Sequence, residues 1–263
     1  MTRAGRPARW AGLLAALAGA LGGCASQVEA PTLEAPPRVR LQSSALAPGN
    51  GGELVAPSAL AAGDILLSSV GTLQSLGIQL VTFAPVSHAL LYLGEGRVAE
   101  AVGEGVGVRS IEQVLDSETM VVAFRDPQLT PVQADAVRRW ALAQVGTRYN
   151  TLGVVLSAPF VVNRRLCEVP LVPGPLRDAC VRGFATIQLG ASSDDRFFCS
   201  QLVLETYRAA DLQLTDASAL LISPADLLHM REGDVATLVP ARPLRYVGHL
   251  KYTPPMVVVS DAP

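Results

Sequence analysis

The chain has 263 residues, a formal net charge of −2 and only 5% aromatic residues. Beyond the N-terminal region, about 205 residues remain, which suits one domain with a hydrophobic core. Lys251 is the single lysine, and the arginine doublets at 138–139 and 164–165 are typical of solvated surface charge. The sequence therefore lacks the basic face that nucleic-acid binding requires, and we expect no nucleic-acid partner.

The first residues have the pattern of an export signal. Arg3, Arg6 and Arg9 give a positive start, and residues 10–21 follow as an uncharged apolar run. This run is about a dozen residues long, whereas a helix that spans a bilayer needs about 20. We therefore predict that residues 1–23 are a signal peptide that is removed, and that they form no anchor helix.

The residues that end this signal resemble the lipobox of bacterial lipoproteins, since residues 21–24 read Leu-Gly-Gly-Cys. The resemblance implies that Cys24 becomes the acylated first residue after cleavage, and several acyl chains would anchor the protein to a membrane. The alternative is an ordinary secretory signal with a coincidental cysteine. No aspartate follows Cys24, and by analogy with lipoproteins this favours the outer membrane, facing the periplasm.

A segment rich in Pro, Ala, Gly and Ser follows the cysteine and has no sustained apolar periodicity. We predict that residues 24–56 form the lipidated cysteine and a flexible tether, and that residues 57–263 form the folded domain.

Short strands dominate the first and last thirds of the predicted domain, and helices lie between them. This arrangement predicts the α+β class. Residues 150–195 are the least regular part. In chain order we expect a strand over 65–69, a helix over 72–82, a hairpin of strands 88–93 and 97–102 around Gly94-Glu95-Gly96, a strand over 107–109, a helix opened by Ser110, a strand over 120–125, a helix from Thr130 to Gly146, a helix over 197–210, a short helix from Pro224 to Met230, and closing strands over 237–240 and 245–252.

The cysteines of the domain divide into a pair and a single residue. Cys167 and Cys180 bracket a proline-rich stretch, and in an oxidising compartment we expect them to form a disulfide. Zinc is disfavoured because neither has a second cysteine or a histidine at ligand spacing. We predict no metal and no cofactor. Cys199 is then left without a partner in an exported protein.

Cys199 lies where a predicted helix begins. The unpaired N–H groups and the dipole of a helix N-terminus lower the pKa of a thiol and favour the nucleophilic thiolate. The backbone N–H of Cys199 would also point toward an oxyanion at an attacked carbon. The alternative is a small buried apolar residue, but the position and the unpaired state favour a nucleophile.

A thiolate nucleophile needs a base, and His88 is the best candidate among the three histidines. In the predicted hairpin residue 88 faces residue 102, so Glu100 lies one diagonal step away on the same face. Glu100 would hold one ring nitrogen of His88 and aim the other at Cys199. The alternative for Glu100 is an edge-strand carboxylate. We expect His229 to be structural and give His249 only a small chance of a site role.

These motifs together resemble the YiiX/YaeF/YebB group, which are papain-like hydrolases of the NlpC superfamily with a circularly permuted order. The residues that carry the resemblance are Ser-His-x-x-x-Tyr at His88, Val-x-Glu-Ala at Glu100, Gly-x-x-Tyr at Tyr149 and Phe-Cys-Ser-Gln-Leu-Val at Cys199. It covers residues 57–252. Asn150 departs from the aspartate of the family, so no role is assigned to it. The resemblance makes Tyr149 a candidate for oxyanion or substrate contact, and a core tyrosine is the equal alternative.

The resemblance implies a cysteine hydrolase or acyltransferase that acts on amide, ester or thioester bonds through an acyl-enzyme on Cys199. The substrate would be a small molecule, a lipid or a peptide. We favour a lipid or acyl substrate, because the segment from 150 to 190 is apolar and proline-rich and the protein is expected at a membrane. The alternatives are a peptidoglycan-peptide amidase or endopeptidase, a non-catalytic ligand-binding lipoprotein on the same fold, and a structural envelope protein.

Overall fold

The computed structural model describes residues 25–29, 36–43, 45, 52–71, 79, 84–149, 167–168, 172–188 and 196–253. The predicted signal peptide, Cys24, Asn150 and the predicted helix over 72–82, apart from Gln79, lie outside these residues. Within the described part, no helix is long and apolar enough to cross a membrane.

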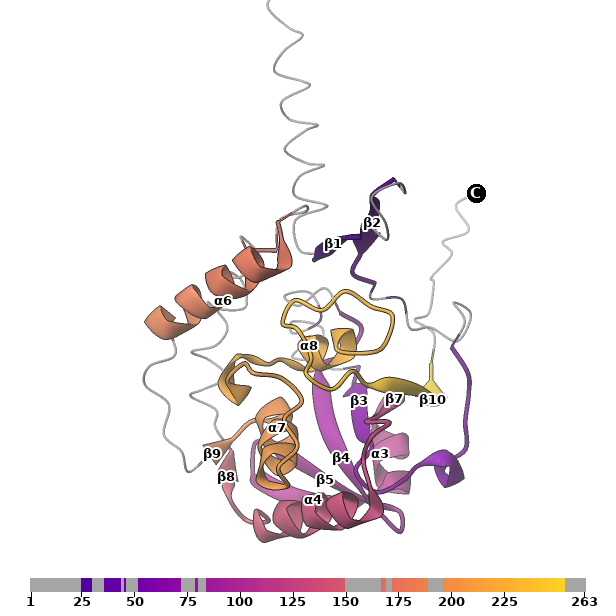
Figure 1. The fold of residues 1–263 in the computed structure, drawn as a ribbon. Coiled ribbons are helices and arrows are strands. Elements are labelled where there is room, and N and C mark those ends of the chain that lie inside the picture. The colour runs from indigo at the N-terminus through magenta and orange to yellow at the C-terminus, as the bar shows by residue number, and fades with distance from the viewer. Residues whose placement is uncertain are drawn as a thin grey trace, which may run out of the picture.

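A six-stranded antiparallel sheet forms the centre of the fold, with the strand order β10-β7-β3-β4-β5-β6. Two small sheets accompany it: β1 pairs antiparallel with β2, and β8 pairs parallel with β9. With helices beside the sheet (Figure 1), the predicted α+β class is confirmed. The elements are β1 (Ser26–Glu29), β2 (Arg38–Leu41), η2 (Pro57–Ala59), β3 (Ile65–Ser69), β4 (His88–Gly94), β5 (Arg97–Val102), β6 (Gly105–Ser110), α3 (Ile111–Ser117), β7 (Met120–Arg125), α4 (Pro131–Ala143), β8 (Arg148–Tyr149), α6 (Gly174–Gln188), β9 (Arg196–Phe197), α7 (Cys199–Ala209), η4 (Ala219–Leu221), α8 (Pro224–His229) and β10 (Arg245–Tyr252).

Both faces of the central sheet are covered. All five residues of β3 are buried, and alternate side chains enter different cores because the side chains of a strand alternate between faces. Ile65 packs on the side of α4 and α7, whereas Leu66 packs on the side of α3. Two buried faces explain why β3 begins with three consecutive apolar residues.

Three helices begin with the caps that their sequences predict. In each, a Ser or Thr side chain accepts a hydrogen bond from the backbone N–H three residues later. The side chain at that later position in turn accepts a hydrogen bond from the backbone N–H of the capping residue. The pairs are Ser110 and Gln113 for α3, Thr130 and Gln133 for α4, and Ser223 and Asp226 for α8.

The hairpin of β4 and β5 also follows the prediction. Glu95 and Gly96 both have positive φ values, 52° and 70°, which are typical of the tight turn whose twist suits a hairpin. The pairing of Leu91 with Ala99 sets the register in which residue 88 would face residue 102.

Two predictions about secondary structure are wrong. The closing strand over 237–240 is absent, and there only Pro240 makes an isolated bridge, to Thr215. A proline cannot donate to a strand ladder, which explains why no strand forms. The part expected to be irregular contains α6, in which Pro175 occupies the first turn, where a proline without an N–H is tolerated.

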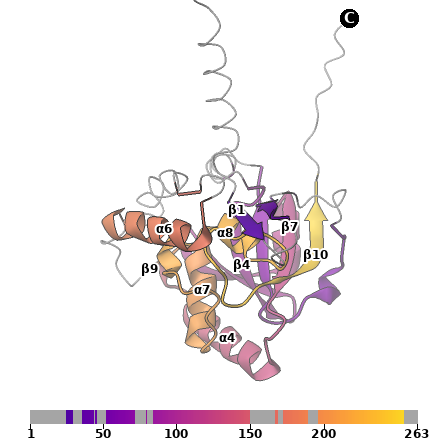
Figure 2. The same ribbon diagram turned by 45° about the horizontal axis from the view of Figure 1, so that its top comes forward.

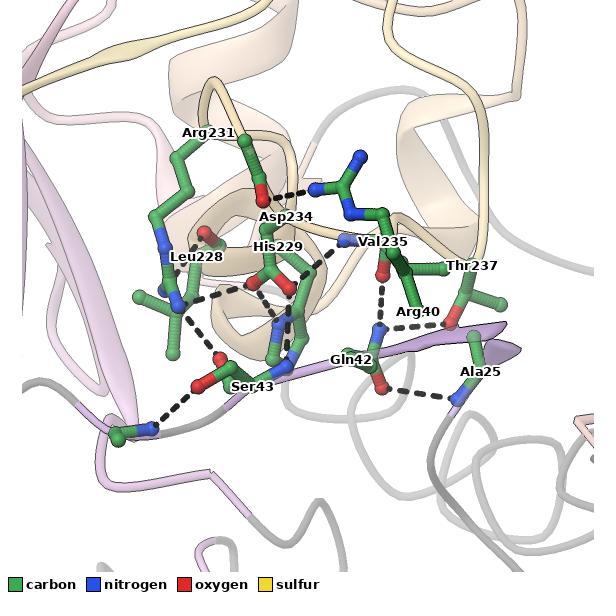
Figure 3. Close-up of polar contacts among 12 residues, drawn as sticks. Ala25, Arg40, Gln42, Ser43, Leu228, His229, Arg231, Asp234, Val235 and Thr237 are labelled. Atoms are coloured by element: carbon green, nitrogen blue, oxygen red, sulfur yellow. Dashed lines mark hydrogen bonds and ion pairs between the residues drawn. The ribbon is translucent and has the colours of Figure 1, made fainter. Parts of the chain in front are cut away.

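The prediction of a flexible tether over 24–56 is also wrong for much of that segment. The β1–β2 hairpin packs on the domain through polar contacts of residues 40–43 (Figure 3). Further along, Leu54 bridges to His249 of β10, and the backbone N–H of His249 donates to Glu53 at 2.6 Å. The ordered body therefore begins before residue 57.

Cys167 and Cys180 form a disulfide, which joins the segment before α6 to the middle of that helix. Cys199 is the one free cysteine in the described part of the chain, and it is buried.

The disulfide predicts a defined labelling pattern. A thiol reagent applied to the denatured, unreduced protein should modify the peptide of Cys199 but not those of Cys167 and Cys180. After reduction it should modify all three. Closing a loop of about 15 residues stabilises a fold by about 3 kcal/mol in the chain-entropy model, so the Cys167→Ser/Cys180→Ser variant should unfold at lower denaturant concentration. Labelling of either residue before reduction would contradict the bridge.

Candidate active site

Helix α7 begins at Cys199 and crosses one face of the sheet, where it contacts β4 and β5. Polar contacts hold both of its ends. Near the start, the buried Ser200 hydroxyl donates to the carbonyl of Ile222. Near the other end, the Tyr207 hydroxyl donates to the carbonyl of Gly63, just before β3. These contacts fix where the first turn of α7 lies.

His88 is the first residue of β4 and pairs with Ser68 of β3. The structure brings it close enough to Cys199 for each side chain to shift the pKa of the other. The thiol also meets the backbone N–H groups of Ala89, on β4, and Ser200, on α7. A sulfur that receives these N–H groups is in surroundings that favour the thiolate.

Glu100 of β5 lies on the other side of the imidazole. The Nε2 atom of His88 is 2.9 Å from Oε2 of Glu100. The remaining ring nitrogen, Nδ1, is the one left for Cys199. The hairpin register predicts this neighbour for His88, whereas Cys199 comes from a segment about a hundred residues further along the chain.

Arg109 of β6 completes this cluster and has no predicted role. Its guanidinium makes an ion pair with Oε1 of Glu100, and Nη2 donates to Oε2 at 3.1 Å. Arg109 also donates to the Ser117 hydroxyl at 3.1 Å and lies 3.6 Å from a carboxylate oxygen of Glu118. Glu100 pairs with Gly107, so Arg109 is its diagonal neighbour. The cross-strand rule that selected Glu100 would have found Arg109 too.

The electrostatics of the cluster favour charged forms of both Cys199 and His88. Burial lowers the pKa of His88, but the Cys199 thiolate and then Glu100 outweigh it and raise the pKa to about 10. Burial raises the pKa of Cys199, but His88 and the two backbone N–H groups reverse the effect and lower it. For Glu100, hydrogen bonds and charges of His88 and Arg109 overcome burial, so its pKa is also lowered.

The first turn of α7 has no side-chain cap. Its N-cap is Phe198, whose side chain has no acceptor for the N–H groups of that turn. Just before it, β9 pairs parallel with β8, and Phe197 is the partner of Tyr149. The backbone of Tyr149 thus lies beside the strand that leads to Cys199, whereas its side chain lies outside the described atoms.

A glycine places β8 in this position. Gly105, at the start of β6, has a φ of 128°, and a Cβ there would lie 2.4 Å from the carbonyl oxygen of Thr147. The backbone N–H of Val106 then donates to that same oxygen at 2.8 Å. Only glycine allows this close approach without strain.

The other two histidines lie elsewhere. His229 is buried at the end of α8, with Nδ1 2.8 Å from Asp234, in keeping with the structural role expected of it. His249 lies on β10 and contacts the Tyr246 hydroxyl at 2.6 Å. Among the described residues there is no group of three or more His, Cys, Asp or Glu side chains that could hold a metal ion.

A thiolate can attack an electrophilic carbon, and an imidazolium beside it can then protonate the leaving group. In the chain, the histidine strand β4 precedes the cysteine helix α7 by about a hundred residues.

No protein-family model matches the sequence. One curated relative is 39% identical over 202 residues, which are 76% of this chain and 73% of the relative; it is named "Probable lipoprotein peptidase YaeF" and comes from Escherichia coli K12. The crystal structure of YiiX from Escherichia coli O157:H7, titled a metalloprotein, is 18% identical and superimposes with a TM-score of 0.43 over 73% of this chain and 98% of that one. Identity of this extent to YaeF shows that the chain belongs to the YaeF-like family, which its His88 and Cys199 motifs resemble.

Proposed function

We propose that the protein is a lipid-anchored cysteine hydrolase of the bacterial cell envelope, with Cys199 as nucleophile, His88 as its acid–base partner and Glu100 as the residue that orients His88. The observation that carries this proposal is the series from Cys199 through His88 to Glu100, in which Cys199 and His88 shift each other's pKa and His88 contacts Glu100 at 2.9 Å. Arg109 would act as a positioning residue, because it binds both carboxylate oxygens of Glu100.

The reaction would begin when the Cys199 thiolate attacks the carbonyl carbon of the substrate. The carbonyl π electrons move to oxygen, and the N–H groups at the start of α7 would stabilise the oxyanion. The carbonyl then re-forms, the bond to the leaving group breaks, and the His88 imidazolium gives its proton to that group. A thioester on Cys199 remains. Water, deprotonated by His88, hydrolyses it and regenerates the thiol.

The substrate class is the open part of the proposal. The printed name of the relative favours a peptide amide bond, as in peptidoglycan peptides or envelope proteins. The apolar sequence over 150–190 instead favours an acyl or lipid substrate, with an ester or thioester bond. Product analysis with muropeptide and phospholipid pools, comparing wild type with Cys199→Ala, distinguishes the two.

The catalytic pair predicts non-additive losses. General acid–base catalysis typically contributes about 10²–10⁴-fold, so His88→Ala and Cys199→Ala should each reduce turnover by roughly 10³-fold or more. Because the two act as a unit, the double variant should be hardly slower than either single one. Turnover of the muropeptide or lipid substrate by purified variants measures this.

Two variants serve as controls. Cys199→Ser keeps the size of the side chain but should remain nearly inactive, since a hydroxyl is a much weaker nucleophile. Glu100→Gln should lose less than His88→Ala, because the amide still hydrogen-bonds the ring. Losses for His88→Ala and Cys199→Ala that multiply in the double variant would contradict a shared step.

The thiolate predicts a distinctive pH dependence. Since His88 lowers the pKa of Cys199, alkylation by iodoacetamide should reach its plateau below the pH of about 8.5 at which an ordinary thiol ionises. In His88→Ala only the backbone N–H groups of Ala89 and Ser200 still oppose burial, so the pKa of Cys199 should rise and the rate should still climb at pH ~9. Denatured protein gives the reference curve. An unchanged profile in His88→Ala would show that the histidine does not ionise the thiol.

The anchor has its own test. In cells supplied with labelled palmitate, the wild-type protein should carry the label and fractionate with membranes. Cys24→Ala should carry none and should remain unprocessed or become soluble. Cys199→Ala is the matched control, because it also removes one cysteine but should be labelled like the wild type. Equal labelling of Cys24→Ala would refute the lipoprotein assignment.

A further inference from the structure

The β1–β2 hairpin presents polar side chains to the body of the protein. Arg40 donates to the carbonyl of Gly233. Gln42, two residues along the same face, donates to the carbonyl of Val235 at 3.0 Å and contacts the Thr237 hydroxyl at 3.4 Å (Figure 3). The inner face of this hairpin is thus held by hydrogen bonds to the loop that follows α8.

Asp234 of that loop anchors the end of the hairpin. Its carboxylate accepts from the backbone N–H of Ser43 at 2.9 Å and lies against His229 and Arg231 at 2.8 and 3.0 Å. Arg231 also donates to the carbonyl of Ser43 at 2.6 Å. A buried carboxylate with these partners makes the contact specific, because detaching the hairpin would leave its hydrogen bonds unmade.

The outer face of the same hairpin is apolar. Val28 and Val39 are cross-strand partners, and Leu41 lies two residues beyond Val39, so all three share one face. Their side chains are 52%, 53% and 52% exposed. A strand pair on a water-soluble surface normally turns its apolar face inward and its polar face to solvent. In this hairpin Val28, Val39 and Leu41 face solvent, whereas Ser26 at the start of the same face is buried.

Apolar surface continues beside the hairpin. Val28 lines a cavity of about 660 Å³ together with Val172 and Val239, although Arg231 and Asp234 also line it. Val239 is itself 66% exposed. We call the surface of Val28, Val39 and Leu41 the apolar face. A patch of contiguous exposed apolar side chains indicates contact with a protein or a membrane.

The position of the predicted anchor identifies the partner. Ala25 is fully buried where the hairpin meets the body, and its carbonyl accepts from the backbone N–H of Gln42 at 2.8 Å. Cys24 is its covalent neighbour, and one residue spans at most about 3.6 Å. Acyl chains on Cys24 would therefore insert next to the apolar face, with no tether between.

We propose that the apolar face docks on the surface of the phospholipid bilayer that holds the acyl chains of Cys24. The catalytic domain is then held directly against the membrane in one orientation. The proposal rests on the lipid anchor of the proposed function and goes beyond it, because a lipidated protein on a flexible tether would need no apolar face.

Tryptophan fluorescence in the full, lipidated protein tests the docking. Trp140 is the only tryptophan beyond the predicted signal peptide, so Trp140→Phe gives a dark background for single reporters. Val39→Trp places a reporter on the apolar face. Val132→Trp places the control on α4, where residue 132 is 77% exposed, at the opposite end of the molecule from β1 (Figures 1 and 2). Both proteins are reconstituted into phosphatidylethanolamine–phosphatidylglycerol vesicles with brominated acyl chains.

Docked apolar faces reach about 5–10 Å into the headgroup and acyl boundary, so bromine should quench roughly half or more of the Val39→Trp emission. Val132→Trp should be unaffected. Leu41→Trp, on the same face as residue 39, should repeat the quenching and guards against a local folding defect at that position. Residues 39 and 41 are each about half exposed, so a tryptophan side chain at either position does not disturb the core.

Two outcomes would overturn the proposal in different ways. If the protein floats with the vesicles but Val39→Trp and Leu41→Trp are as bright as Val132→Trp, the anchor holds and the domain is not docked. If the protein does not float with the vesicles at all, the lipid anchor is refuted, and the docking proposal is refuted with it. Neither result affects the hydrolase assignment, because the reactivity of Cys199 is measured separately.

Discussion

The seating of α7 on the sheet is the constraint on which the candidate site depends. Cys199 and His88 are far apart in the chain, and only the packing of this helix across β4 makes them neighbours. Val203 is fully buried in the main core, and hydrogen bonds from Ser200 and Tyr207 fix the helix near its two ends. Because close-packed interiors resist small shifts, the sulfur keeps its position over the histidine even before a substrate binds.

The charges of neighbouring side chains in the candidate site alternate in sign, and this allows charged groups to be buried there. A lone thiolate would be neutralised by burial, and so would a lone imidazolium. Each charge in the proposed site has a neighbour of opposite sign. The series runs from the thiolate of Cys199 through the imidazolium of His88 and the carboxylate of Glu100 to the guanidinium of Arg109. Arg109 is about one-third exposed, so the series also ends at water. In the proposed site, Glu100 would therefore orient the ring without leaving an uncompensated buried charge, which is how the hairpin could carry a carboxylate among apolar residues.

Local sequence signals predicted the parts of the fold that local chemistry decides. The capping residues at Ser110, Thr130 and Ser223 and the tight turn at Glu95 each satisfy backbone groups within a few residues, so they are visible in the chain. The register of the β4–β5 hairpin then placed Glu100 beside His88. The sequence could not reveal what long-range contacts decide. The outward apolar face of β1 and β2 depends on which side of the pair meets the body.

One segment of the chain contacts both the β1–β2 hairpin and the helix that carries the proposed nucleophile. It therefore connects the proposed membrane contact with the proposed active site. The loop carrying Asp234 follows α8 and holds the hairpin, while Ile222, immediately before the Ser223 cap of α8, accepts the hydrogen bond of Ser200 next to Cys199. The segment from 222 to 235 therefore contacts the β1–β2 hairpin, which follows the predicted anchor, and the start of α7. If the apolar face rests on a bilayer, the same segment fixes the orientation of the nucleophile relative to that bilayer. A substrate held at or near the membrane would then meet the thiolate from one direction, which a freely tethered domain could not impose.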